Sequence, residues 1–235
     1  MMFRVLSDLT PSDPYENLAV EEALSNVKIT SPIIRFWVNV PSVILGMFDR
    51  VEDEVNLDYC IDNEVIIARR HTGGGTVYHD EGNLNISLII PKTTYLDLGT
   101  CYRVLGSLLI QAINSFGVRV DYVDSNALMI NRKKVSGMAG SLTKYSLLCH
   151  STFLVNSDLV ALRNSLKRLK SDVTNLSDEV GETLKPYDIH KAVLNALRNV
   201  FNTDLITDSL GSHEATFARK LYLSKYSRDY WIYRA

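Results

Sequence analysis

A run of three glycines between two β-type segments constrains this chain more than any other feature. Residues 65–68 are apolar and predict a buried strand, which leads directly into Arg69 and Arg70. The glycines at 73–75 follow, and then the β-prone residues 76–78. A P-loop or a dinucleotide fingerprint would need a helix after the glycines, so neither motif fits. The stretch predicts a strand, a glycine turn and a second strand.

The residue types around the glycines suit an anionic ligand. Arginine keeps its charge and forks onto carboxylate or phosphate oxygens. Glycine lets backbone N–H groups approach an anion because no side chain stands in the way. A glycine-rich hairpin without a ligand is the alternative interpretation, and the glycines alone leave it open.

The same stretch resembles a known family. Residues 69–83 read Arg-Arg-x-Thr-Gly-Gly-Gly-x-Val-x-His-Asp-x-Gly-Asn, which is similar to the signature of lipoate–protein ligases. The resemblance implies activation of lipoate by ATP, with Mg²⁺ on the triphosphate and no protein ligand to the metal. The lipoyl-AMP would then acylate a lysine of a lipoyl-domain protein, such as a 2-oxoacid dehydrogenase E2 or the glycine cleavage H protein. The substrate and nucleotide contacts that it implies here are Arg70, Thr72, Gly73, Gly74, Gly75, Val77, His79 and Asn83.

A second motif lies at residues 132–140. Lys133 suits a solvated hairpin turn, whereas Lys134 begins a strand of small residues that leave room for a ligand close to the backbone. A lysine ammonium can bridge a carboxylate and a phosphate. The stretch resembles the family's Lys-Val/Ile-x-Gly-x-Ala motif, which implies that Lys134 is the catalytic residue. The same motif implies ligand contacts from Ser136, Gly137 and Ala139.

Two further residues match the family's lipoyl pocket. Trp37 matches a pocket tryptophan, with a plain core position as the alternative. His150 opens a third motif at residues 150–159, and it either contacts the acyl chain or fills the strand face. A hydrogen-bonded turn is likewise the alternative for His79. We predict that His79 and Asn83 orient phosphate or acyl oxygens.

The chain departs from the family pattern in two places. Asp49 stands where the family has glutamine, three residues after Gly46. Ala127, within the segment 125–128, replaces an acidic residue ahead of the lysine strand. The second departure removes an expected metal or amine contact.

Apolar spacing predicts an α+β or mixed α/β sandwich, because strands cluster before Asn156 and helices after it. The predicted strands are 3–6, 32–37, 43–46, 65–68, 84–90, 122–130, 135–140 and 147–155. The predicted helices are 14–27, 56–63, one from a Thr100 cap to 116, 159–169, 186–201 and 217–222. The resemblance implies the biotin/lipoate-ligase fold, with central β-sheets flanked by helices and related to class II aminoacyl-tRNA synthetases and biotin synthetase.

Length and charge set the remaining expectations. The 235 residues suit one catalytic domain over 1–235 without the C-terminal accessory domain of longer ligases. The short, archaeal-type ligases that it resembles work with a separate small accessory protein. A net charge of -2 gives no case for nucleic acid. The absence of a signal-like or membrane-spanning stretch predicts a cytoplasmic protein with no membrane partner.

Two rival functions stay open at this stage. An octanoyl- or lipoyltransferase would use a thioester on Cys149, next to His150. In cysteine-dependent relatives the thiol lies near the Ser125 position or shortly before the histidine, so Cys149 fits neither place. A non-catalytic protein that binds lipoyl-adenylate is the other rival, motivated by Ala127. The sequence does not distinguish lipoate from octanoate, or one acceptor from another.

Overall fold

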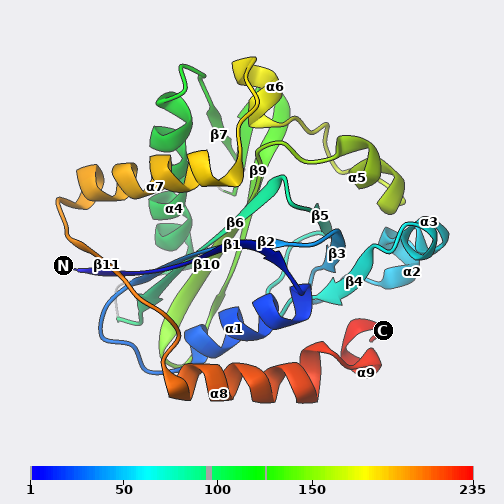
Figure 1. Cartoon of the computed structure of the whole chain (residues 1–235), viewed down its shortest axis with the longest axis horizontal. Coiled ribbons are helices and arrows are strands. Elements are labelled where there is room, and N and C mark those ends of the chain that lie inside the picture. The colour runs from blue at the N-terminus through cyan, green and yellow to red at the C-terminus, as the bar shows by residue number, and fades with distance from the viewer. Residues whose placement is uncertain (1, 94–96, 125, 235) are drawn as a thin grey trace.

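Two β-sheets of unequal size form the centre of the molecule (Figure 1). The structure is a computed structural model that describes residues 2–93, 97–124 and 126–234. Within those residues the larger sheet has eight strands and the smaller has three. The larger sheet runs β11 (Leu205–Thr207), β1 (Phe3–Ser12), β2 (Ile33–Asn39), β6 (Asn83–Pro91), β10 (Ser146–Leu154), β9 (Lys133–Leu142), β8 (Ala127–Ile130) and β7 (Asp121–Val123). The smaller sheet runs β4 (Ile66–Arg69), β3 (Ser42–Leu45) and β5 (Val77–His79).

Helices cover both faces of the larger sheet, α4 and α7 on one side and α1 and α8 on the other (Figure 1). The four helices are α1 (Pro14–Asn26), α4 (Leu98–Asn114), α7 (Pro186–Phe201) and α8 (Ser212–Leu221). Shorter helices are α2 (Val51–Glu54), α3 (Leu57–Asp62), α5 (Leu159–Ser165), α6 (Leu176–Val180) and α9 (Asp229–Ile232), and a π-helical segment spans Tyr222–Tyr226. Because both faces are covered, the central strands β2, β6 and β10 are buried along most of their length.

The helix ends follow local chemistry. Asp13 caps α1, its Oδ1 accepting a hydrogen bond of 2.7 Å from the N–H of Tyr15, and Pro14 takes the first helical position as predicted. The predicted cap of α4 is wrong by three residues. Asp97 supplies the capping oxygen, and Thr100 contributes only the backbone N–H that donates to it, at 2.6 Å.

The hydrophobic core lies between the larger sheet and the α4–α7 layer. Phe36, Leu105 and Val193, from β2, α4 and α7, are representative of it, and each is fully buried. Residues on alternate positions of the same strands face α1 instead. That second face carries many of the polar residues described below. Across the described segments, no helix is both long and apolar enough to cross a membrane.

The mixed α/β prediction is confirmed, with helices on both faces of a large mixed sheet. The sequence did not predict the order of the strands. The strands on either side of the glycines do not pair as a hairpin: β3 lies between them, parallel to β4 and antiparallel to β5. The predicted strand 122–130 is two strands, since Asp124 turns the backbone with φ of 51°. The short elements α2, α6 and β11 escaped prediction.

Candidate functional site

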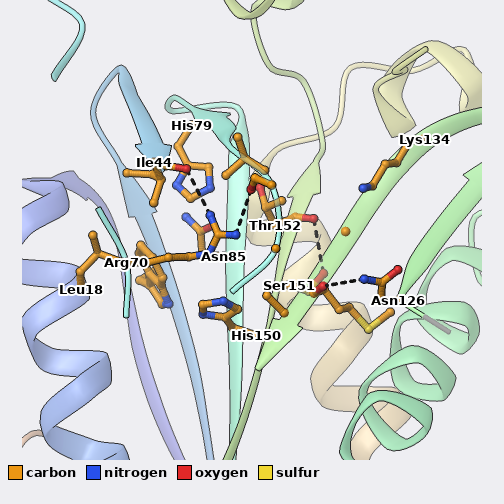
Figure 2. A pocket seen from close by; sticks show the side chains of 17 residues that line it. Leu18, Ile44, Arg70, His79, Asn85, Asn126, Lys134, His150, Ser151 and Thr152 are labelled. Carbon is orange, nitrogen blue, oxygen red and sulfur yellow. Dashed lines mark hydrogen bonds between the residues drawn. The ribbon is translucent and has the colours of Figure 1, made fainter. Parts of the chain in front are cut away.

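A cavity of about 100 Å³, the first cavity, opens where the two sheets meet (Figure 2). Helix α1 and strands of both sheets contribute to its wall. The lining residues are Leu18, Trp37, Ile44, Arg70, Gly74, Gly75, Val77, His79, Asn85, Asn126, Lys134, Gly137, Met138, Ala139, His150, Ser151 and Thr152. A second cavity of about 160 Å³ adjoins it and shares Gly75, Val77, Lys134, Gly137 and Thr152. The two cavities therefore meet beside Lys134.

Arg70 holds the glycine loop, which we define as residues 70–76. Its Nη2 donates to the carbonyls of Gly73 and Gly75 at 2.7 and 2.9 Å, and its Nη1 donates to the carbonyl of Ile44 at 3.2 Å. Burial lowers the pKa of Arg70 to about 10, which leaves it charged at neutral pH. The arginine fork thus grips the loop's own carbonyls, and its charge lies in the cavity wall.

The loop passes so close to the residue after β3, Gly46, that a side chain is excluded there. A Cβ on Gly46 would lie 2.0 Å from the carbonyl oxygen of Gly74. Gly74 itself has φ of +87°, a conformation that favours glycine. Asp49 closes the turn, because its Oδ2 accepts hydrogen bonds from the Gly46 N–H at 3.2 Å and from Thr76 Oγ1 at 2.8 Å. The residue that replaces the family's glutamine therefore binds the loop.

The neighbouring arginine, Arg69, binds the C-terminal segment. Arg69 donates from Nε and Nη2 to the carbonyl of Ile232, at 3.0 and 2.8 Å. Trp231 returns a hydrogen bond of 2.9 Å from its indole N–H to the carbonyl of Arg69. Arg69 Nη1 also donates to the carbonyls of Gly46 and Asp49, at 3.0 and 2.5 Å. Arg69 thus joins the C-terminal helix to the turn after β3, whereas Arg70 binds the glycine loop.

Lys134 stands across the first cavity from Arg70 and His150 (Figure 2). Its Cε and Nζ lie over Gly137, where an added Cβ would come within 2.8 Å of both atoms. In the described part of the chain, no carboxylate pairs with this ammonium, and no Asp or Glu lines the first cavity. Burial lowers the pKa of Lys134, and the charges of Lys170 and Arg70 lower it further. A half-buried cation without a counter-ion favours an anionic ligand.

His150 is fixed by a buried chain of hydrogen bonds. Its Nδ1 lies 2.8 Å from Glu21 Oε2, and its Nε2 lies 2.9 Å from Thr72 Oγ1, which in turn accepts from Arg70 Nε at 3.0 Å. Glu21 is fully buried and also accepts from Ser87. Burial alone would raise the pKa of Glu21, but His150 and the other partners lower it to about 2. The carboxylate is therefore ionised within this network.

The structure places most of the predicted site residues around the first cavity. Those that line it are Trp37, Arg70, Gly74, Gly75, Val77, His79, Lys134, Gly137, Ala139 and His150. Thr72 and Gly73 lie behind the wall as hydrogen-bond partners of Arg70, and Ser136 lines the second cavity. Asn83 is also behind the wall, where it donates to Asn85 Oδ1 at 3.2 Å. Thr72 and Asn83 are buried and line neither cavity, whereas Gly73 is half-buried with open space beside it. Their predicted ligand contacts stay predictions.

Other residues of the site were missed from the sequence. Glu21 passed as part of an amphipathic helix, although a carboxylate on a buried face is a signal of a polar network. Asn85 sits at a buried strand position where an apolar residue would be usual. Lys170 comes from the segment that follows α5, and its Nζ lies 2.8 Å from a Cβ built on Gly75. That segment is joined to β9 by the Lys134 N–H, which donates to the carbonyl of Asp172 at 2.7 Å.

A sequence model of one enzyme family matches most of the chain. It describes the lipoyl protein ligase A/B catalytic domain and matches residues 13–198. This chain belongs to that family.

Individual family members resemble it over nearly their whole length. Lipoate-protein ligase A subunit 1 of Thermoplasma acidophilum is 30% identical, over 97% of this chain and 95% of its own. A T. acidophilum lipoate protein ligase with bound lipoic acid superposes with a TM-score of 0.91 at 30% identity, covering 100% of both chains. A lipoate-protein ligase A bound with ATP gives 0.90 at 31% identity, covering 98% of each. The bipartite T. acidophilum ligase, described with its E2 lipoyl domain, gives 0.88 at 29% identity, covering 98% of this chain and 95% of that one.

Membership of the lipoyl ligase family leaves the cysteine route to be judged from the geometry. Cys149 is fully buried in the core beneath α4, on the opposite face of β10 from His150, and it lines neither cavity. Burial raises the pKa of its thiol well above the ordinary value, and Cys101 raises it further. A nucleophile must be reachable and readily ionised. The geometry therefore does not support the rival hypothesis of a thioester on Cys149, and Ser125 lies outside the described residues.

Few of the described side chains that line the two cavities suit a magnesium ion, which prefers carboxylate oxygens. No Asp or Glu lines the first cavity, and Glu54 is the one carboxylate among the described residues that line the second. Within the described ranges, no three His, Cys, Asp or Glu side chains gather as a metal site. A magnesium ion at the second cavity would thus have Glu54 as its one carboxylate within the described lining.

Proposed function

We propose that this chain is an ATP-dependent lipoate–protein ligase whose reaction takes place where the first and second cavities meet. The observation that carries the proposal is the position of Lys134. Its ammonium has no counter-ion among the described residues, it is half-enclosed, and it is shared by both cavities. Two substrates in the two cavities would present their anionic groups to the same cation.

The first cavity suits the acyl chain of lipoate. Leu18, Trp37 and Ile44 give it an apolar side, which matches a hydrocarbon chain. The lipoyl-pocket role predicted for Trp37 and His150 is consistent with this assignment, since both line the cavity and both are held by hydrogen bonds.

The second cavity suits the nucleotide. Leu154, Leu162 and Val173 form an apolar wall for a base, while Arg168 and Lys170 offer positive charge to phosphates. Both cations make only long ion pairs with Glu54, of 3.6 and 4.0 Å, and their side chains are more than half exposed. They can turn toward a triphosphate at little cost.

In the first half-reaction, a lipoate carboxylate oxygen attacks the α-phosphorus of ATP. The bond to the β-phosphate oxygen breaks, pyrophosphate leaves, and lipoyl-AMP remains. Negative charge builds on the oxygens around phosphorus, where Lys134 and the backbone N–H groups of Gly74 and Gly75 can stabilise it. Arg70 holds this part of the loop in place by donating to the carbonyls of Gly73 and Gly75.

In the second half-reaction, the amine of an acceptor lysine attacks the acyl carbon of lipoyl-AMP. The amine loses a proton, the bond to the phosphate oxygen breaks, and AMP leaves as an amide forms. The leaving AMP carries negative charge next to Lys134, which stabilises that step by the same electrostatic means. Mg²⁺ bound to the triphosphate of ATP would screen the negative charge of the phosphates during the first half-reaction.

The acceptor is a lipoyl domain in this proposal, and a separate small protein assists the ligase. The bipartite composition and the E2 lipoyl domain named for the T. acidophilum system support both parts. We extend the same proposal to a single catalytic domain over residues 1–235, as the match to residues 13–198 and the near-complete overlap with relatives support.

Release of pyrophosphate from ATP, measured with a panel of carboxylic acids, tests the function. We expect release with lipoate and other medium-length acids, and none with biotin or acetate. A non-catalytic binder would instead bind lipoyl-adenylate tightly in calorimetry and release no pyrophosphate, even with an accessory protein present. That result would overturn the proposal.

A further inference from the structure

Two residues that line the first cavity each carry a buried nitrogen atom without a partner among the described residues. His79 Nε2 and Asn85 Nδ2 have no hydrogen-bond acceptor in the described part of the chain, although their residues are only 4% and 2% exposed. Figure 2 shows both side chains on the side of the cavity away from Lys134. Buried polar atoms are rarely left unpaired, because doing so costs free energy. A ligand atom that could pair with them would be favoured at this end.

A buried chain of hydrogen bonds from Arg35 to His79, which we call the relay, determines which ring nitrogen of His79 is a donor. Arg35 can only donate, and its Nη2 donates to Asn17 Oδ1 at 2.5 Å. Asn17 Nδ2 must then be the donor to Asn39 Oδ1, at 2.9 Å, and it donates to the Val38 carbonyl as well, at 3.2 Å. Asn39 Nδ2 is left to donate to His79 Nδ1, at 3.0 Å.

The relay places the ring proton of His79 on Nε2. A neutral imidazole has one N–H, and its Nδ1 is occupied as an acceptor. Burial, with the charge of Arg70 second, lowers the pKa of His79 to about 3, so the ring is neutral at physiological pH. His79, which lines the cavity, therefore carries a fixed and unpaired Nε2–H donor.

A second relay orients Asn85 in the same sense. Thr152 Oγ1 donates to Asn83 Oδ1 at 2.5 Å, and Asn83 Nδ2 donates to Asn85 Oδ1 at 3.2 Å. With its oxygen occupied, Asn85 turns its NH₂ group to the cavity. Asn83 thus takes part in the site by holding Asn85.

The strand register sets how far Asn85 lies from Lys134. Trp37, Asn85, Thr152 and Gly137 stand opposite one another on β2, β6, β10 and β9, in one row across the sheet. Adjacent strands are about 4.8 Å apart, so Asn85 is about 10 Å from Gly137, over which the Lys134 ammonium lies. This is close to the length of an extended octanoyl chain.

We propose that His79 and Asn85 are specificity-determining residues that favour lipoate over octanoate, with Asn39 and Asn17 as positioning residues for His79. The inference rests on the proposed function, in which the carboxylate meets Lys134 and the chain runs toward β6. The far end of lipoate carries ring sulfurs, which accept hydrogen bonds weakly. Octanoate ends in a methyl group, which leaves both donors unpaired on binding.

Activation kinetics with the two acids test the inference. We expect wild type to show a kcat/KM for lipoate on the order of tenfold above that for octanoate. Asn85→Leu, which keeps the size but removes the donor, should lower this ratio toward one while retaining octanoate activation. Asn39→Asp should do the same from outside the cavity, because a carboxylate draws the His79 proton to Nδ1. Asn195→Asp, an exposed change on α7, is the matched control and should leave the ratio unchanged.

A nitrogen NMR experiment reads the relay without turnover. Wild type should show His79 protonated at Nε2, and Asn39→Asp should show it protonated at Nδ1. An Nδ1–H ring in wild type, a wild-type ratio near one, or a ratio that Asn85→Leu leaves unchanged would each overturn the inference. If lipoate is still activated in those cases, the ligase function stands. If neither acid is activated, both fail.

Discussion

The two sides of the first cavity are built in opposite ways. The side that includes Arg70, His150 and Glu21 is a closed network in which charged groups pair with one another or with backbone. On the other side, no described carboxylate pairs with Lys134. Lys170, in the adjoining second cavity, makes only an ion pair of 4.0 Å with Glu54 among the described residues. The comparison teaches that one side maintains shape, whereas the other is left open for the ligand's charge.

Substitutions on the closed side should have the larger effect on the free energy of unfolding. Glu21→Ala leaves His150 and Ser87 without their buried acceptor, and we expect it to lower the free energy of unfolding by about 3–5 kcal/mol. Glu21→Gln keeps the size and one oxygen, so it should cost less. Urea denaturation measures both, and equal stability of Glu21→Ala and wild type would show that the network does not hold this side.

Substitutions on the open side should have the larger effect on the rate of pyrophosphate release. Lys134→Ala removes the shared cation, and lipoate-dependent pyrophosphate release should fall roughly 10²–10³-fold with little change in unfolding free energy. Lys133→Ala is the matched control, because the neighbouring lysine is exposed and lines neither cavity. Similar rates for the two variants would remove Lys134 from the mechanism.

Acid should weaken the closed side. Burial lowers the pKa of His71 to about 4 and that of His79 to about 3, against an ordinary value of 6.5. The unfolded chain therefore binds protons below pH 6.5 that the folded chain excludes, and unfolding free energy should fall as pH drops from 6.5 to 4. The limiting slope is about 1.4 kcal/mol per pH unit for each histidine.

Urea titrations at several pH values would measure this slope, and His71→Gln should reduce it. Glu21 acts at lower pH, because its depressed pKa gives stability that is lost only as pH falls from 4.5 toward 2. A flat profile between pH 6.5 and 4 would contradict the buried, neutral state of the two histidines.

The glycine loop lies between the two sides, and its glycines should differ in how well they tolerate substitution by alanine. Gly74→Ala forces a side chain into positive φ with its Cβ 3.0 Å from Arg70 Nη2, at a cost of about 1–2 kcal/mol. Gly73→Ala meets nothing within 4 Å and should be tolerated. Thermal unfolding and pyrophosphate release of the pair would compare them, and equal behaviour would mean that the loop is not fixed by Arg70.

Local elements were predictable where the sequence signal is local. The cap and proline at the start of α1 and the apolar spacing of α7 gave their positions closely. The insertion of β3 between β4 and β5 was not predictable, because strand pairing depends on contacts between distant segments. The break between β7 and β8 depends on a positive φ at Asp124, a residue that gives only a weak turn signal.

The site was predictable to a similar degree. The residue types at 70–75 and at Lys134 pointed to anion chemistry, and the structure places Arg70, Gly74, Gly75 and Lys134 around one cavity. The sequence could not show that Arg70 turns to its own loop, since carbonyl positions follow from the fold. Glu21 and Asn85 were missed because burial, which makes a polar residue informative, is a tertiary property.

A crystal structure with a stable sulfamoyl analogue of lipoyl-AMP would test the central claim most directly. The account predicts the acyl chain in the first cavity, the adenosine in the second, and Lys134 Nζ within hydrogen-bond distance of the group that joins them. An analogue bound elsewhere, or bound here with the Lys134 ammonium turned away to solvent, would contradict it.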